Sequence, residues 1–142
     1  MSKKAVAISD YPLAENRPDL VHDHGGRSLD EITLEKVIAG EVDMAGLRIT
    51  PEALKLQAEI ARAAGRPTLA ANFERAAELV NVPQEVIMEV YELLRPGRAT
   101  GKAPLLEAAV RLRETFGAEK MAAFVEEAAA VYETRGLFNY RF

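Results

Sequence analysis

The clearest helix start in this chain lies in Leu47-Arg48-Ile49-Thr50-Pro51-Glu52-Ala53-Leu54-Lys55-Leu56-Gln57-Ala58. Thr50 is a favoured N-cap residue, proline fits the first helical position, and Glu52 places negative charge near the positive end of the helix dipole. Gly65 follows as a typical helix stop, and Pro67 opens the next element. These signals predict a helix over residues 51–64.

Similar signals on both sides predict a helical protein. Ser28 and Glu31 have capping-box spacing, which predicts a helix over 29–39 that stops at Gly40. Apolar residues that recur at helical spacing predict further helices at 67–80, before Pro96, at 104–116 and before Gly136, with Leu69 and Tyr91 on buried faces. No strand pattern of any strength is present. We therefore expect an all-α fold, an irregular bundle of about six short helices with an extended N-terminal arm.

The chain is expected to divide into an arm at 1–27, a helical domain at 28–136 and a tail at 137–142. The arm contains Pro12, Pro18, Gly25 and Gly26 and shows no helical period. Its apolar positions between Tyr11 and Val21 favour docking on another surface, while residues 1–9 could equally be a disordered tail. The tail contains three aromatic residues after a helix stop, which favours docking on a groove over a free, fraying end.

Composition excludes several function classes. With 142 residues, 49% hydrophobic content and 28% charged residues, the chain is typical of one ordinary soluble domain. It has no cysteine, which excludes disulfides and thiolate chemistry and fits a reducing cytoplasm. A net charge of -4 argues against nucleic acid and anionic membranes as partners. No apolar run is long enough for a signal peptide or a membrane span.

The residues give no catalytic, cofactor-binding or metal-binding constellation. His22-Asp23-His24 is the only cluster with metal-ligand character, and no further histidine or cysteine completes a site. We interpret it as structural or solvated rather than as a metal site. The helices flanking Asn81-Val82-Pro83 have helix-turn-helix length, but Glu85, Glu89 and Glu92 would be repelled by DNA phosphates.

Several short stretches, read in order, resemble the small (gamma) subunit of adenosylcobalamin-dependent diol and glycerol dehydratases. The resemblance runs from about Tyr11 to about Arg135. It is carried by Leu47 to Ala58 together with Tyr11-Pro12-Leu13, Ser28-Leu29-Asp30-Glu31-Ile32-Thr33-Leu34, Glu74-Arg75-Ala76-Ala77-Glu78-Leu79 and Leu93-Leu94-Arg95-Pro96. The aromatic tail departs from the more charged ending of that family.

The resemblance implies a subunit of a carbon–oxygen lyase. Such enzymes are dimers of three-chain units that convert propane-1,2-diol or glycerol into an aldehyde and water by a radical mechanism. The large subunit holds the substrate, the medium subunit helps to bind adenosylcobalamin, and the small subunit packs on the large one without supplying a known catalytic group. A cytoplasmic location is expected, with packing in a bacterial microcompartment left open.

The expected contribution of this chain is a partner interface made by its arm and by the link before the helix at 51–64. Arg48 and Arg95 lie next to segment borders, where an interface role and a solvated or intrachain ion pair are equally favoured. The interface residues expected from the sequence are Tyr11, Pro12, Leu13, Arg17, Leu20, Arg48, Ile49 and Arg95. The alternative function is a free-standing helical adaptor that binds a peptide or helix through an alanine-lined groove.

Overall fold

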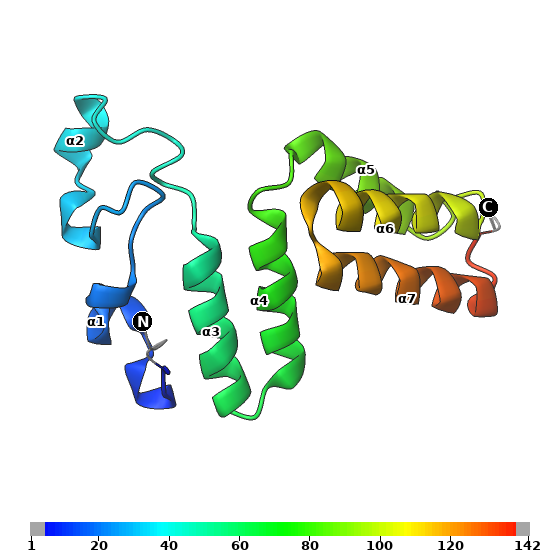
Figure 1. The fold of residues 1–142 in the computed structure, drawn as a ribbon, viewed down its shortest axis with the longest axis horizontal. Coiled ribbons are helices and arrows are strands. Elements are labelled where there is room, and N and C mark those ends of the chain that lie inside the picture. Colours follow the sequence, from blue (N-terminus) through cyan, green and yellow to red (C-terminus); the bar gives the residue numbers. More distant parts are fainter. Residues whose placement is uncertain (1–4, 139–142) are drawn as a thin grey trace. The chain divides into compact units, whose positions relative to one another are not determined.

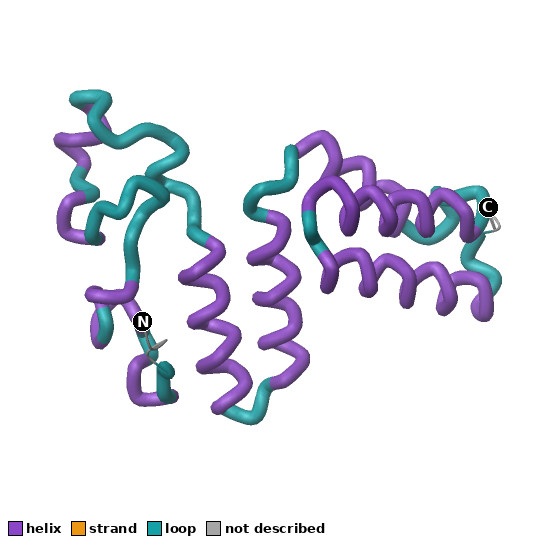
Figure 2. The backbone as a smooth tube through the Cα atoms, viewed as in Figure 1, coloured by secondary structure: helices purple, strands orange, loops and turns teal. Residues whose placement is uncertain are grey.

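A computed structural model describes residues 5–138 and confirms the all-α class. Figure 1 and Figure 2 show that every regular element in this range is helical. The described residues form two compact units, which we call unit 1, up to Val80, and unit 2, from Asn81 onward. This division lies inside the single helical domain expected at 28–136. The domain boundaries expected at residues 27 and 136 stay predictions.

The core of unit 1 is the antiparallel pair of α3 (Pro51–Ala63) and α4 (Pro67–Leu79), which lie side by side in Figure 1. The predicted N-cap is confirmed, because the Thr50 hydroxyl accepts a hydrogen bond from the Ala53 amide at 3.2 Å. Three small residues, Ala58, Ala61 and Ala70, are buried between the helices with Phe73 packed against them. Alanine lets the two backbones approach closely, so this contact is tight without large side chains.

Unit 2 consists of α5 (Gln84–Leu94), α6 (Lys102–Phe116) and α7 (Glu119–Arg135). α6 and α7 form its main contact, and their buried residues are Leu105, Ala109, Leu112, Ala122, Val125 and Ala129. Arg113 joins the two helices, since its guanidinium donates to Glu119 at 2.9 Å and to both oxygens of Glu126 at 2.8 and 2.9 Å. The predicted stops at Gly117 and Gly136 are confirmed as left-handed C-caps.

The helix predicted over 29–39 is split in two. The structure has a 3-10 turn, η3 (Leu29–Glu31), followed by a five-residue helix, α2 (Leu34–Ile38). The Ser28 amide and hydroxyl both donate to Glu31 at 2.9 Å, but Ile32 and Thr33 are extended. Thr33 then acts as a second N-cap, its hydroxyl oxygen accepting from the Lys36 amide at 3.3 Å. Two competing caps, Ser28 and Thr33, lie five residues apart and therefore interrupt the helix.

The N-terminal arm is less extended than expected. Its described part contains η1 (Ile8–Asp10), α1 (Leu13–Asn16) and η2 (Pro18–Leu20). Prolines explain two of these turns, because Pro12 precedes α1 as its N-cap and Pro18 occupies the first position of η2. η1 contacts α3, so this part of the arm packs on the chain's own unit 1.

Two predicted buried positions are wrong. Leu69 and Tyr91 are exposed, because α4 turns Ala70 and Ala77 inward and α5 turns Val86 and Val90 inward. The first tail residues are docked as expected: the Gly97 amide donates to the Leu137 carbonyl at 2.8 Å, and the Phe138 ring packs edge-on against Tyr132. The rest of the expected tail, 139–142, lies outside the described residues, as do residues 1–4 of the arm.

Candidate partner interface

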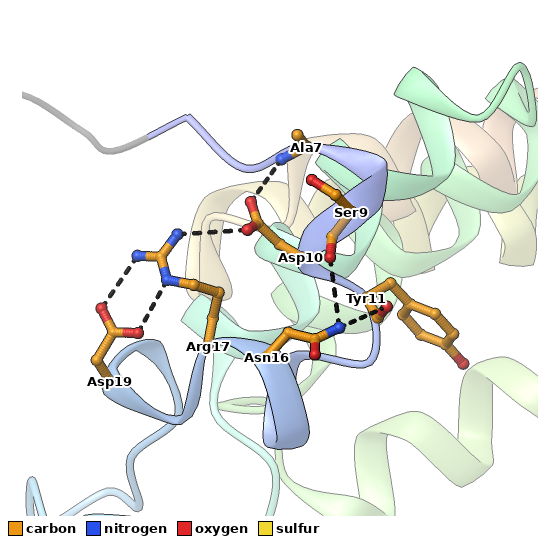
Figure 3. A network of polar contacts seen from close by, with 7 residues as sticks. All are labelled: Ala7, Ser9, Asp10, Tyr11, Asn16, Arg17 and Asp19. Carbon is orange, nitrogen blue, oxygen red and sulfur yellow. Dashed lines mark hydrogen bonds and ion pairs between the residues drawn. The ribbon is translucent and has the colours of Figure 1, made fainter.

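A polar network gives the arm a defined shape (Figure 3). The Asn16 side-chain amide donates to the carbonyls of Tyr11 and Ser9, at 2.9 and 3.3 Å. The Arg17 guanidinium donates twice to Asp19, at 2.9 and 3.0 Å, and lies 3.7 Å from a carboxylate oxygen of Asp10. Hydrogen bonding to Asp19 raises the pKa of Arg17. Arg17, an expected interface residue, is therefore engaged in holding the arm together.

The arm brings some of the expected interface residues to the surface and buries others. Tyr11 is 61% exposed and Pro12 is also exposed, whereas Leu13 is buried in the chain's own fold. Leu20 is half-buried. Tyr11 and Pro12 are therefore accessible and their role at an interface stays a prediction, while Leu13 is buried at the start of α1.

Tyr11 lines an apolar hollow of about 330 Å³ within unit 1, which we call the Tyr11 hollow. Ile8 lines it from the arm, and Ile60, Leu69 and Phe73 line it from α3 and α4. The exposed position of Leu69 thus has a consequence, because its side chain forms part of the wall. The volume of the hollow lies at the lower end of the range of about 300–1,000 Å³ that is usual for ligand pockets.

The next loop is built around Asp23. Its Oδ1 accepts from the backbone amides of Gly25 and Arg27, both at 2.8 Å, and its Oδ2 accepts from the Arg27 guanidinium at 3.1 Å. These hydrogen bonds, led by the one from the Arg27 amide, lower the pKa of Asp23. His22 and His24 on either side are exposed. No group of three potential ligands that could hold a metal ion occurs among the described residues.

The link between α2 and α3 packs onto this loop through Gly46. A Cβ atom at Gly46 would lie 3.1 Å from a methyl carbon of Val42 and 3.2 Å from Oδ2 of Asp23. Both of those side chains are buried, so only glycine fits there without displacing a neighbour. This contact fixes the link at a point two residues before Arg48. Arg48 and Ile49, two expected interface residues, follow directly and are exposed.

Sequence reasoning did not single out four exposed apolar side chains of unit 1. Leu34, Ile38, Met44 and Leu47 are 69%, 76%, 71% and 51% exposed, and we call residues 34–47 the anchor segment. One signal in the sequence could have indicated part of this surface: the nine-residue link from Glu41 to Ile49 contains four large apolar residues, Val42, Met44, Leu47 and Ile49, and only Val42 is buried. The prediction of one long helix over 29–39 led away from an exposed surface, because a helix of that length is expected to pack its apolar face on the core.

Arg95, the last of the expected interface residues, lies in unit 2. It is exposed and its guanidinium donates to both oxygens of Glu92, at 3.0 and 3.2 Å. An exposed ion pair one helical turn apart contributes little to stability. Arg95 is thus partly engaged, and its expected role at an interface stays a prediction.

The fold and this surface together define a class of protein. No helix in the described range is both long and apolar enough to cross a membrane. A helical chain that leaves a run of large apolar side chains uncovered on one segment has the character of a subunit, since such patches mark protein interfaces.

The particular family follows from comparison with known proteins. The model of the dehydratase small subunit family matches residues 6–139, and the chain belongs to that family. It is 48% identical over 134 residues to the propanediol dehydratase small subunits of Citrobacter freundii and of Salmonella typhimurium strain LT2. In both cases the match covers 94% of this chain and 77% of the relative. The family named from the sequence is thereby confirmed.

Proposed function

We propose that this chain is the non-catalytic small subunit of a propanediol dehydratase and that it stabilises the assembled enzyme by packing on the large subunit. The observation that carries the proposal is the exposed surface of unit 1, where Tyr11 of the arm is exposed and Arg48 and Ile49, also exposed, directly follow the anchor segment in the sequence. Binding that occurs only in the assembled state stabilises that state by mass action. The proposed reaction of the whole enzyme is the conversion of a vicinal diol, propane-1,2-diol or glycerol, into an aldehyde and water.

The residues of this chain do not fit the binding of adenosylcobalamin. A hollow of unit 1, about 630 Å³ in volume, is lined by four acidic residues, Asp19, Asp23, Glu52 and Glu59, by His22 and His24, and by Lys55 as its one lysine. An open, acidic surface repels the phosphate group that cobalamin carries. We therefore propose that the other subunits bind the cofactor, which supplies the radical chemistry, and we derive no catalytic step on this chain.

The proposed partners are the large and medium dehydratase subunits, in a dimer of three-chain units. The proposed location is the cytoplasm, because a chain without cysteine fits a reducing compartment. The adaptor alternative predicts a stable, monodisperse isolated chain with no exposed apolar face. The uncovered side chains of the anchor segment argue against it.

The decisive experiment is co-expression with the large and medium subunits encoded in the same genome. Size-exclusion chromatography and a diol-to-aldehyde assay with adenosylcobalamin follow. We expect this chain to elute with the other two and its omission to lower the yield or activity of the enzyme. If it elutes alone and omission changes nothing, the subunit role is refuted and the adaptor role replaces it.

A paired set of variants locates the interface. Tyr11→Ala with Arg48→Ala should weaken assembly, because both side chains are exposed on unit 1. The matched control is Tyr91→Ala with Arg98→Ala, which removes the same two residue types from exposed positions of unit 2. Unchanged assembly and activity in the first double variant would show that the arm and link contacts are wrong.

A further inference from the structure

We propose that the anchor segment, residues 34–47, is the main attachment of this chain and inserts into an apolar groove with a basic rim on the large subunit. The inference deepens the proposed function and rests on it. It names a contact that differs from the arm and from Arg48 and Ile49. Three properties of this segment support it: the weak internal packing of α2, the exposure of its apolar side chains, and the charge of the residues around them.

α2 lacks the packing that a helix of its length needs. It has five residues, and none of them is buried within the described part of the chain. Isolated helices much shorter than about 12 residues are marginal in water, because nucleation is costly and few hydrogen bonds repay it. Hydrogen bonds close both of its ends, from the Lys36 amide to the Thr33 hydroxyl and from the Glu41 and Val42 amides to the Lys36 carbonyl, but no side chain of α2 is buried. A partner surface that covers α2 would supply the packing that the described part of the chain does not.

The exposed side chains of the anchor segment indicate that the partner surface is apolar. Leu34 and Ile38 are four residues apart on α2 and so lie on one face of the helix. Met44 and Leu47 follow in the link, on either side of the point where Gly46 is fixed against Asp23 and Val42. Exposed apolar side chains on one helix face, here Leu34 and Ile38, match the helix-in-groove mode of recognition, in which apolar anchors fill pockets of a groove. The link beneath it is held in place before binding.

The charge of the residues around the anchor segment indicates the charge expected at the edge of the partner groove. Residues 30–47 contain five carboxylates, Asp30, Glu31, Glu35, Glu41 and Asp43, and one lysine, Lys36. Among the described residues none of these carboxylates makes an ion pair. Their hydrogen-bond partners are local, such as the Ser28 amide for Glu31 and the Gly46 amide for Asp43. Lys36 offsets this negative charge only in part, through its attraction to Asp30 and Glu31, and the acidic surplus that is left is complementary to a groove edged by lysine and arginine.

The test titrates the full-length chain into a purified complex of the large and medium subunits and measures the dissociation constant. Leu34→Ser with Ile38→Ser should weaken binding about 30-fold or more, as expected when two central apolar anchors are removed. The matched control is Met88→Ser with Tyr91→Ser, which removes exposed apolar side chains from α5 and should change binding by less than about threefold. Circular dichroism should show unchanged helix content in both, since α2 buries nothing.

Charge and local protection give two further readouts. Glu35→Gln with Glu41→Gln should weaken binding and flatten its dependence on salt, whereas Glu107→Gln with Glu114→Gln, exposed on α6, should do neither. In the wild-type complex, amide hydrogen exchange in residues 34–47 should slow on binding.

The outcomes separate this inference from the proposed function. If the wild-type chain binds and the Leu34 and Ile38 variant binds equally well, the anchor is refuted while the subunit role stands. If the isolated chain self-associates and that variant abolishes only the self-association, the occupant is a second copy and the inference is also refuted. If the wild-type chain does not bind the large and medium subunits, both proposals fail.

Discussion

Replacing Gly46 with alanine tests whether the link is held by a close contact. The new Cβ would lie 3.1 Å from Val42 and 3.2 Å from Asp23, closer than ordinary van der Waals contact. Neither neighbour can withdraw freely, because Val42 is 2% exposed and the Asp23 carboxylate accepts three hydrogen bonds. Overpacking of this kind costs about 1–3 kcal/mol. The lost freedom of glycine in the unfolded chain offsets about 0.4–1 kcal/mol, so the expected net loss is about 1–2 kcal/mol.

The assay is urea unfolding followed by circular dichroism, because the chain has no tryptophan to serve as a fluorescent probe. Gly101→Ala is the matched control. A Cβ at Gly101 would meet nothing within 4 Å, and the backbone there is extended. Alanine is a slightly poorer N-cap than glycine, which lowers stability, but it reduces the conformational freedom of the unfolded chain, which raises stability. The two effects oppose each other, so the free energy of unfolding should change by no more than about 0.5 kcal/mol. Equal stability of the two variants would refute the close packing of the link on the Asp23 loop.

Three further predictions concern the same elements. Leu112→Ala should lower the free energy of unfolding by about 2–5 kcal/mol, because Leu112 is 1% exposed, whereas Tyr91→Ala should change it by less than about 0.5 kcal/mol; urea unfolding measures both. Thr50→Ala should cost about 1 kcal/mol and speed amide exchange in the first turn of α3, since it removes the cap on the Ala53 amide. Asp23 has a folded-state pKa below its usual value near 3.8, so its stabilising effect is present above about pH 4 and is lost as pH falls through the folded pKa. Amide protection of the loop at 23–27 should fall over that range, and Asp23→Asn should lose this pH dependence; an identical acid profile in the variant would contradict the role of the carboxylate.

The proposals assign different roles to the two units, with attachment to other subunits made by unit 1. Unit 1 presents the arm, the Tyr11 hollow and the anchor segment, all of which suit contact with another protein. Unit 2 has a tighter core of its own around Leu105, Leu112 and Val125, each buried almost completely. Variants that unfold unit 2 should therefore be distinguishable from variants that abolish attachment, because only the former lose helix content.

Much of the helical framework could be predicted from local sequence signals. The start of α3 at Pro51 and the stops at Gly117 and Gly136 follow from capping and backbone preferences that act within a few residues. The family could also be named from short stretches read in order. Local rules failed at 29–39, where two N-caps compete and the sequence does not show which one continues into a helix.

The sequence by itself determined the all-α class, most helix ends and the absence of any cysteine-based chemistry, because these depend on residue type and on neighbours along the chain. Only the tertiary structure decided which apolar residues are covered. Leu13 became core and Leu34, Ile38 and Met44 became surface, although all four are large and apolar. Burial depends on which segments meet in space. Helical periodicity predicts the direction in which a side chain points, but it does not predict which element or partner protein the side chain meets there.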